Sequence, residues 1–356
     1  MTSTAFRLAL LLLATPLSVA SGAPPTTSAG PGAPELLSVE RIWDKAPHNA
    51  FTDLIRYNDQ WVCAFREAPE HKGGVKDSTM RVVVSKDAKS WEPAASLSDP
   101  RGDIRDAKMA ILPDGRLTLL TAIQLFDRSK GQSHQSIAYF TRDLKTWEGP
   151  VDVGQPNFWM WGIKFHKGTG YSIGYATGSD PKSVRLFKTT DGVKYEPIVE
   201  KLEISAPFPN ENAIYFDKDD TARCLLRCDP VKGSDGTTNA FIGTAKPPYT
   251  DWKWMETTAR VGGPALTRTP DGRLLGAGRL YEPKPRTSLF WIDENTGKIT
   301  ECLTFPSGGD TSYPGLVWHD GVLHVSYYST HEDKKSRIYF AKVKVPAATA
   351  AASTSR

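Results

Sequence analysis

The sequence has few cysteines, so a fold built on disulfides is excluded. Its 356 residues include only Cys63, Cys224, Cys228 and Cys302, and the fold must therefore rest on a hydrophobic core. Cys224 and Cys228 lie in one strand-like run, separated by about 13 Å along a strand, which is too far for a direct bond. Whether any other pair is bonded is left open by the sequence.

Long apolar runs and a strong net charge are also lacking. After the first segment, no run reaches the roughly 20 apolar residues that a membrane span needs. The formal net charge is only +4, and such a small excess argues against nucleic acid as the main partner. Residues of the hydrophobic class make up 39% of the chain and charged residues 24%, which is ordinary for a folded protein.

Signatures of cofactor and metal chemistry are missing as well. No glycine-rich phosphate loop and no Ser-His-Asp signature stands out. His48, His71 and His331 fall in expected loops, and their spacing does not indicate a metal site. We therefore expect neither a cofactor nor a metal.

The two ends of the chain read as segments outside the fold. Arg7 precedes the apolar run 8–13, and small residues follow at 17–20, which together are typical of a secretory signal peptide over residues 1–20. Residues 21–36 are rich in Pro, Gly, Ser and Thr and predict a flexible leader, and residues 347–356 predict a disordered tail. We expect a secreted or periplasmic monomer with one folded domain over 37–346.

Within that domain the sequence repeats. Each unit has an apolar run, a polar turn, a second apolar run, a variable loop and an alternating strand, and most units end on an aromatic residue beside a charged one. The period of about 50 residues is typical of a β-propeller. The six units are Phe51–Pro93, Met109–Pro150, Ile163–Pro197, Ala213–Trp254, Ala265–Ile292 and Gly315–Val343.

The sequence thus predicts an all-β fold, a six-bladed β-propeller with almost no helix. The sixth unit lacks an outer strand, while Leu37–Trp43, ahead of the first unit, is a strand-like run without a place. We expect this N-terminal strand to complete the last blade, because closure hides an exposed sheet edge.

Three turns share a further pattern of Ser or Thr, then Asp, then an aromatic residue four positions later. They are Ser85-Lys86-Asp87-Ala88-Lys89-Ser90-Trp91, Thr141-Arg142-Asp143-Leu144-Lys145-Thr146-Trp147 and Thr190-Asp191-Gly192-Val193-Lys194-Tyr195. An Asp in such a turn can bond to the N–H groups of the turn itself. These turns resemble degenerate Asp boxes (BNR repeats) of sialidases and related propellers, a motif that supports the fold and not the activity.

The inner strands of a propeller meet at its axis, so residues at equivalent positions of distant units converge. Tyr313 and Glu211 open the sixth and fourth inner strands in this way. Asp53, Asp106 and Trp161 come at similar positions of the first three units. The ends of the second strands carry three arginines, Arg66, Arg227 and Arg279. A tyrosine, several carboxylates and guanidinium groups are therefore expected to face one cavity.

This order of residues resembles the exo-α-sialidase superfamily, which is six-bladed, uses a Tyr nucleophile assisted by a Glu and an Asp acid/base, and binds the substrate carboxylate with three arginines. The segment Asn210-Glu211-Asn212 followed by Arg227 is similar to the fourth-blade pair, Arg279 to the fifth-blade arginine, and Thr311-Ser312-Tyr313-Pro314-Gly315 to the tyrosine segment. The resemblance implies Tyr313 as nucleophile, Glu211 as its base and Asp77 as acid/base. The chemistry agrees, because the carboxylate on the anomeric carbon of sialic acid would repel an Asp or Glu nucleophile.

One departure keeps the substrate open. The Phe-Arg-Ile-Pro motif of the family is replaced here by Asn49-Ala50-Phe51-Thr52-Asp53, without the first arginine, and Arg66 or Arg105 would have to substitute. Asp106 and Asp53 either contact substrate or form ion pairs. Trp161 either stacks on a sugar or fills the channel.

The interpretation is an exported, retaining exo-glycosidase that releases a terminal acidic sugar, with sialic acid first. Its partner is a glycan or glycoconjugate. Two alternatives remain: a propeller glycosidase or polysaccharide lyase that acts on uronic acids, and a glycan-binding propeller without catalysis.

Overall fold

The computed structural model describes residues 32–177, 183–231, 233 and 238–348. The predicted signal peptide (1–20), residues 21–31 of the predicted leader and residues 349–356 of the predicted tail lie outside this part of the chain. Over the described ranges no helix has the length and apolar character to cross a membrane.

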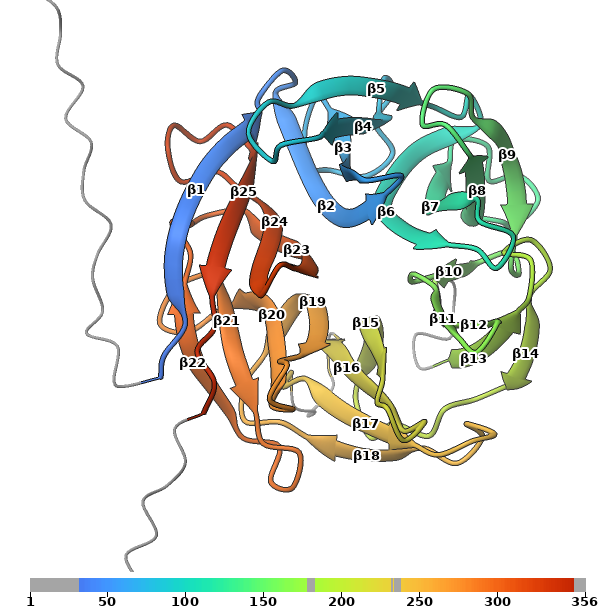
Figure 1. The fold of residues 1–356 in the computed structure, drawn as a ribbon. Helices are drawn as coiled ribbons and strands as arrows, with labels where there is room; N and C mark the ends of the chain where they lie inside the picture. Colours follow the sequence, from blue (N-terminus) through green and yellow to red (C-terminus); the bar gives the residue numbers. More distant parts are fainter. Residues whose placement is uncertain (1–31, 178–182, 232, 234–237, 349–356) are drawn as a thin grey trace, which may run out of the picture.

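The chain folds into six antiparallel sheets arranged as blades around a central axis, the propeller that the repeat predicts (Figure 1). The first blade contains β2 (His48–Tyr57), β3 (Gln60–Ala68), β4 (Thr79–Ser85) and β5 (Glu92–Leu97). The second contains β6 (Gly102–Ile111), β7 (Leu117–Leu125), β8 (His134–Thr141) and β9 (Glu148–Val153). The third contains β10 (Phe158–Met160), β11 (Lys164–His166), β12 (Thr169–Ala176), β13 (Val184–Thr189) and β14 (Glu196–Val199). The next two contain β15 (Phe208–Phe216), β16 (Ala222–Asp229), β17 (Phe241–Ala245), β18 (Lys253–Glu256); and β19 (Val261–Arg268), β20 (Leu274–Leu280), β21 (Arg286–Ile292), β22 (Ile299–Thr304).

The sixth blade joins the two ends of the folded chain. It consists of β23 (Thr311–His319), β24 (Val322–Ser329), β25 (Arg337–Lys344) and, outermost, β1 (Glu35–Trp43). The outer pair is antiparallel and runs from Glu35 opposite Lys344 to Trp43 opposite Ile338. The predicted closure by the N-terminal strand is therefore confirmed, and it covers the edge of β25.

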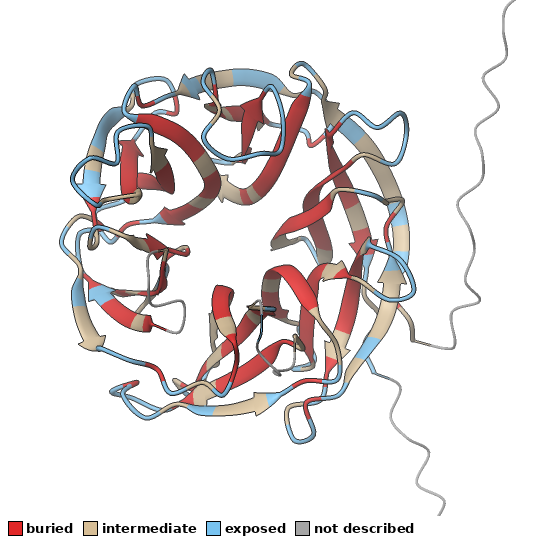
Figure 2. Ribbon diagram, turned by 180° about the vertical axis from the view of Figure 1, so that it is seen from behind, coloured by how far each residue is buried: buried red, intermediate tan, exposed pale blue. Residues whose placement is uncertain are grey.

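The hydrophobic core lies between neighbouring blades. In one cluster Val62 and Val82 of the first blade pack against Leu119 and Ile137 of the second. The alternation along each strand produces this arrangement, because successive side chains point to the two blades on either side. Figure 2 shows the consequence: buried residues dominate the inner strands, while the outer strands and the turns carry most of the exposed ones.

The three Asp-containing turns at the ends of the third strands have the bonding predicted for them. The Asp87 carboxylate accepts the N–H groups of Lys89 (2.9 Å) and Ser90 (2.8 Å). Asp143 and Asp191 accept the equivalent pairs of N–H groups in their own turns. These contacts stabilise the three turns, each of which joins the third strand of its blade to the fourth.

The inner strands share an irregularity that shapes the axis. In β2, β6, β15, β19 and β23 the pairing to the second strand skips two residues, so each inner strand carries a bulge at nearly the same height. In the third blade the inner strand is split into β10 and β11 around Trp161. A bulge bends the strand and redirects its side chains, and here the bulged residues of several blades face one another.

Candidate active site

A cavity of about 360 Å³ opens at the level of the bulges. Its lining combines two carboxylates, a set of aromatic rings and a few polar groups. These are Asp106 and Glu211; Phe51, Trp159, Trp161, Tyr175 and Tyr313; and His71, Gly73, Arg105, Gln124 and His134. Five of the six blades and the loop after β3 contribute, so the cavity exists only because the ring is closed.

Tyr313 and Glu211 are bonded to each other in this cavity. The Tyr313 hydroxyl donates to Glu211 Oε1 at 2.5 Å, although the two residues are 102 positions apart. The same oxygen accepts a hydrogen bond from Arg227 at 2.7 Å, and Glu211 Oε2 accepts the N–H of Gly263 at 3.0 Å. The structure thus brings together the phenol and the carboxylate that the sequence predicts to face one cavity.

The environment keeps the phenol protonated at rest. Burial raises the pKa of Tyr313 well above its usual range, the charge of Glu211 raises it further, and Arg227 opposes both. A neutral phenol bonded to a carboxylate becomes a nucleophile only if the carboxylate accepts the proton as the phenol oxygen attacks. Glu211 is at the right distance to be that acceptor.

Asp106 is the second carboxylate of the cavity and has a different character. Its side chain is buried, and no described residue donates a hydrogen bond to its carboxylate. Burial raises its pKa to about 6, a shift that Arg105 opposes and Glu211 reinforces. A carboxyl group with such a pKa carries its proton at mildly acidic pH and can transfer it to a leaving oxygen.

Three residues of the lining have strained backbones. Phe51 (φ 62°), Asp106 (φ 57°) and Tyr313 (φ 52°) adopt the left-handed region, which disfavours residues other than glycine. Such a conformation costs about 1–3 kcal/mol at each position and concentrates at functional sites. In each case the strained residue lies in the bulge of its inner strand, so the strain accompanies the turn of the side chain toward the cavity.

The arginines named from the sequence each have protein partners. Arg227 bonds to Glu211 and, at 3.2 Å, to Tyr313, and its other nitrogens lie against Asp229. Arg279 donates to the carbonyl of Thr311 at 2.6 Å and to Asp310 at 3.3 Å. Neither arginine belongs to the cavity lining.

Arg66, predicted to bind substrate, lies elsewhere. Its guanidinium is fully buried and donates three hydrogen bonds to Asp103, at 2.9, 3.1 and 3.2 Å. It also donates to the carbonyl groups of Glu70 and Lys72 in the loop after β3. The donors are thus used within the protein, and Arg66 anchors the loop that supplies His71 and Gly73 to the cavity. The cationic group that does line the cavity is Arg105, which the sequence offered as one of two substitutes.

Asp77 is not brought to the cavity either. It is exposed, with φ of 65°, and borders a separate surface depression together with Glu67 and Thr79. The structure therefore separates the residue chosen as acid/base from Tyr313 and Glu211, which line the axial cavity without it. The carboxylate that lines the cavity beside Glu211 is Asp106.

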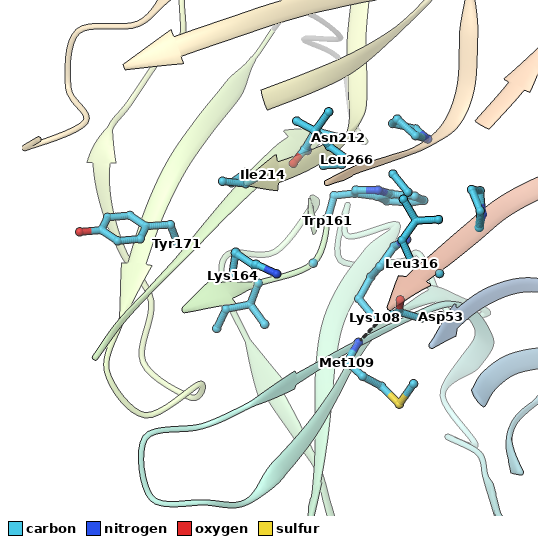
Figure 3. A pocket seen from close by; sticks show the side chains of 17 residues that line it. Asp53, Lys108, Met109, Trp161, Lys164, Tyr171, Asn212, Ile214, Leu266 and Leu316 are labelled. Carbon is cyan, nitrogen blue, oxygen red and sulfur yellow. Dashed lines mark hydrogen bonds between the residues drawn. The ribbon is translucent and has the colours of Figure 1, made fainter. Parts of the chain in front are cut away.

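Asp53 faces a second cavity along the axis, of about 140 Å³, that shares Trp161 with the first (Figure 3). Its carboxylate accepts the N–H of Met109 at 2.6 Å, and Lys108 and Lys164 line the same space. Trp161 therefore stands between two compartments, and its ring contributes to the floor of the site that contains Tyr313.

Several lining residues were outside the sequence-based set. Phe51 belongs to the same inner hairpin as Asp53 and Arg66, but an aromatic residue in a strand gives no sign of whether it faces a cavity or a neighbouring blade. His71 lies in a loop whose path the sequence does not indicate.

Comparison with known proteins gives the fold. No protein-family model matches the sequence, and no curated protein matches it. Among solved structures, a Dyadobacter fermentans protein of unknown function has a TM-score of 0.76 and 19% identity over 88% of this chain and 100% of that one. A Penicillium chrysogenum α-L-arabinanase in complex with arabinobiose has a TM-score of 0.69 and 14% identity over 87% and 99%.

A Trypanosoma rangeli sialidase in complex with sialic acid is also similar, with a TM-score of 0.65 and 12% identity. The match covers 89% of this chain and 59% of that one. The fold is shared. At these identities the similarity establishes the propeller architecture alone, and the activity has to be argued from the cavity.

Proposed function

We propose that the protein is a glycoside hydrolase that removes a terminal sugar from a glycan by a retaining mechanism. The observation that carries the proposal is the 2.5 Å hydrogen bond from Tyr313 to Glu211 in a cavity that also contains Asp106. The solved glycosidases with the same fold, an arabinanase and a sialidase, support the reaction class.

Each residue has one role in this reaction. The Tyr313 oxygen attacks the anomeric carbon while its proton passes to Glu211, and Asp106 gives its proton to the departing glycosidic oxygen. In the second half, Asp106 takes a proton from water, the water attacks the anomeric carbon, and the Tyr313–sugar bond breaks as Glu211 returns the proton. Arg227 holds Glu211 in place and stabilises the developing negative charge on the phenol oxygen.

The lining favours a neutral sugar. Recognition of a sugar carboxylate requires guanidinium groups with free donors, whereas Arg227 and Arg279 are paired with Glu211, Asp229 and Asp310, and Arg66 with Asp103. The one arginine in the lining, Arg105, also lies 3.7 Å from Asp103. The aromatic rings around the cavity suit the apolar faces of a neutral sugar.

Sialic acid is the second candidate, and a specific observation favours it. A tyrosine nucleophile avoids the repulsion that a carboxylate nucleophile would meet at an anionic anomeric centre. The hydrogen bond from Tyr313 to Glu211 supports assigning that role to Tyr313. An anionic sugar would then be held by Arg105, together with Arg227 or Arg279 after a shift of their present partners.

A panel of chromogenic glycosides tests both candidates. It should include arabinofuranosides and other neutral pyranosides and furanosides, sialosides and glucuronides. We expect turnover of a neutral glycoside with retention of the anomeric configuration. Proton NMR of the released sugar monitors that configuration. A 2-fluoro sugar with a good leaving group should trap the intermediate on Tyr313, which peptide mass spectrometry would locate.

The alternatives give different outcomes in the same panel. Turnover of sialosides alone would select the second candidate. Release of an unsaturated product from a uronic-acid polymer would indicate a lyase, and saturable binding without turnover would indicate a glycan-binding protein. Inversion of configuration would exclude the tyrosyl intermediate and leave Tyr313 a positioning role.

A further inference from the structure

A second cluster of chemically active groups lies beside the cavity and has no part in the proposed hydrolysis. His48 Nε2 is 3.0 Å from Asp310 Oδ2, and His71 Nδ1 is 2.6 Å from the same oxygen. The three ligand atoms all lie within 4.8 Å of one another. They come from the start of β2, the loop after β3 and the residue before β23.

We propose that His48, His71 and Asp310 form a binding site for a divalent transition-metal ion of the Zn²⁺ type at the wall of the cavity. Two imidazole nitrogens and one carboxylate oxygen are a ligand set that Zn²⁺ prefers. Around a tetrahedral Zn²⁺ with bonds of about 2.1 Å, neighbouring ligand atoms are about 3.4 Å apart, so the two Asp310 contacts need to lengthen by less than 1 Å to admit the ion.

The surroundings hold the carboxylate as a metal site requires. Asp310 Oδ1 accepts the Tyr328 hydroxyl at 2.7 Å and faces Arg279 at 3.3 Å, which leaves Oδ2 for the histidines. Hydrogen bonds that orient a ligating carboxylate are characteristic of metal sites.

The site also has an open side. His48 is buried, whereas about half of the His71 side chain is exposed, and His71 is part of the cavity lining. With three protein ligands, a tetrahedral ion keeps a fourth position for water or another oxygen ligand. The ion would connect the loop after β3 in the first blade to the sixth blade and so fix one wall of the cavity.

Zinc titration calorimetry on the full chain, after EDTA treatment and desalting, tests the site directly. At pH 7.5 we expect one equivalent of Zn²⁺ to bind to the wild type, and the affinity to fall about tenfold or more in His71→Ala. His166→Ala is the matched control, because His166 also bonds to a carboxylate (Asp220, 2.8 Å) but, within the described residues, belongs to no group of three possible metal ligands. Its affinity should equal that of the wild type.

Two further measurements keep the test independent of folding and of hydrolysis. Co²⁺ bound in place of Zn²⁺ should give visible absorption bands that His71→Ala weakens, while a thermal melt without metal shows that this half-exposed substitution leaves the fold intact. Tyr328→Phe, which removes one bond to Asp310, should weaken Zn²⁺ binding about tenfold. Absence of saturable binding, or equal binding by His71→Ala, would overturn the proposal whether or not the protein hydrolyses glycosides.

Discussion

Two tyrosines near the axis each donate to a carboxylate beside an arginine, and the backbone decides which of them reaches the cavity. Tyr313 bonds to Glu211 next to Arg227, and Tyr328 bonds to Asp310 at 2.7 Å next to Arg279. The two rings lie 6.0 Å apart, between centroids. Their chemistry is therefore nearly the same, and their access to a ligand differs.

The difference lies in strand geometry. Tyr313 belongs to the bulge of β23, with φ of 52°, and lines the cavity, whereas Tyr328 lies in the regular pairing of β24, is fully buried and does not line it. Residue type alone would rank them equally. The bulge, which costs backbone strain, is what converts one of two similar pairs into a candidate catalytic pair.

The largest expected effect comes from removing each hydroxyl. Tyr313→Phe should lower kcat at least about 10³-fold, because the nucleophile is lost, whereas Tyr328→Phe should change it less than about tenfold. Steady-state kinetics on the best glycoside of the panel, with thermal melts for both variants, gives the comparison. Equal losses would mean that the bulge does not distinguish the two tyrosines.

Asp106 should show the next largest effect, because it lines the same cavity as Tyr313, a cavity that Tyr328 does not line. Asp106→Asn should lower kcat about 10²- to 10³-fold at pH 5. In the wild type the rate should fall as pH rises through about 6, the pKa to which burial raises Asp106, because the acid form is lost. Asp53→Asn is the control, since it removes a carboxylate from the other compartment, and a pH profile that changes there instead would contradict the assignment.

Asp106 and Asp310 should also affect stability with opposite signs. The folded-state pKa of Asp106 is raised from 3.8 to about 6. The contribution of this carboxyl group to the stability of the fold is therefore fully present below pH 3.8 and is lost as pH rises through 6. The difference in unfolding free energy between Asp106→Asn and the wild type should therefore be about 1–3 kcal/mol more favourable to the variant at pH 8 than at pH 4. Urea denaturation at the two pH values measures this, and no gain would mean that the buried carboxylate is not destabilising.

For Asp310 the sign reverses. Burial opposes ionisation, but hydrogen bonds from His48, His71 and Tyr328 outweigh it and lower the pKa of Asp310 well below 3.8. Its contribution to stability is present above pH 3.8 and lost as pH falls. In EDTA, the unfolding free energy of Asp310→Asn should be about 1–3 kcal/mol lower than that of the wild type at pH 7. It should also fall less than that of the wild type as the pH is lowered. A variant as stable as the wild type at pH 7 would show that these bonds contribute little.

Asp77 should show the smallest effect. Because this residue is exposed and outside the cavity lining, Asp77→Asn should leave kcat and its pH profile within about twofold of the wild type. A loss as large as that of Asp106→Asn would return the acid/base role to the loop before β4.

The sequence predicts the ring and the central pair for a physical reason. Repeated units with alternating apolar residues can bury their faces only against one another, and symmetry then brings Tyr313 and Glu211 to one axis. It also places the second-strand arginines near that axis. The sequence does not indicate which residue each arginine pairs with. Arg66 pairs with Asp103, a residue of the next blade, and this pairing depends on how the blades pack.

The remaining differences have a similar origin. Asp77 was selected by its place in a loop, and loops have no periodicity that fixes which side they face. His48, His71 and Asp310 are separated by up to 262 positions, so their spacing gives no sign of a cluster, although His48 and His71 were both noted as loop residues. Asp106 was expected near substrate, but its acidity depends on burial, which only the packed structure provides.

The pairing of β1 with β25 brings the two ends of the folded part together. If these ends were joined, the chain could begin at a different blade without changing the arrangement of the ring. Glu35 lies opposite Lys344, so a short linker between these residues could join the ends of the folded part. New termini opened between two blades, such as between β9 and β10, would give a circular permutant in which every blade is continuous. The same residues would still surround the axis, in a protein with a different first residue.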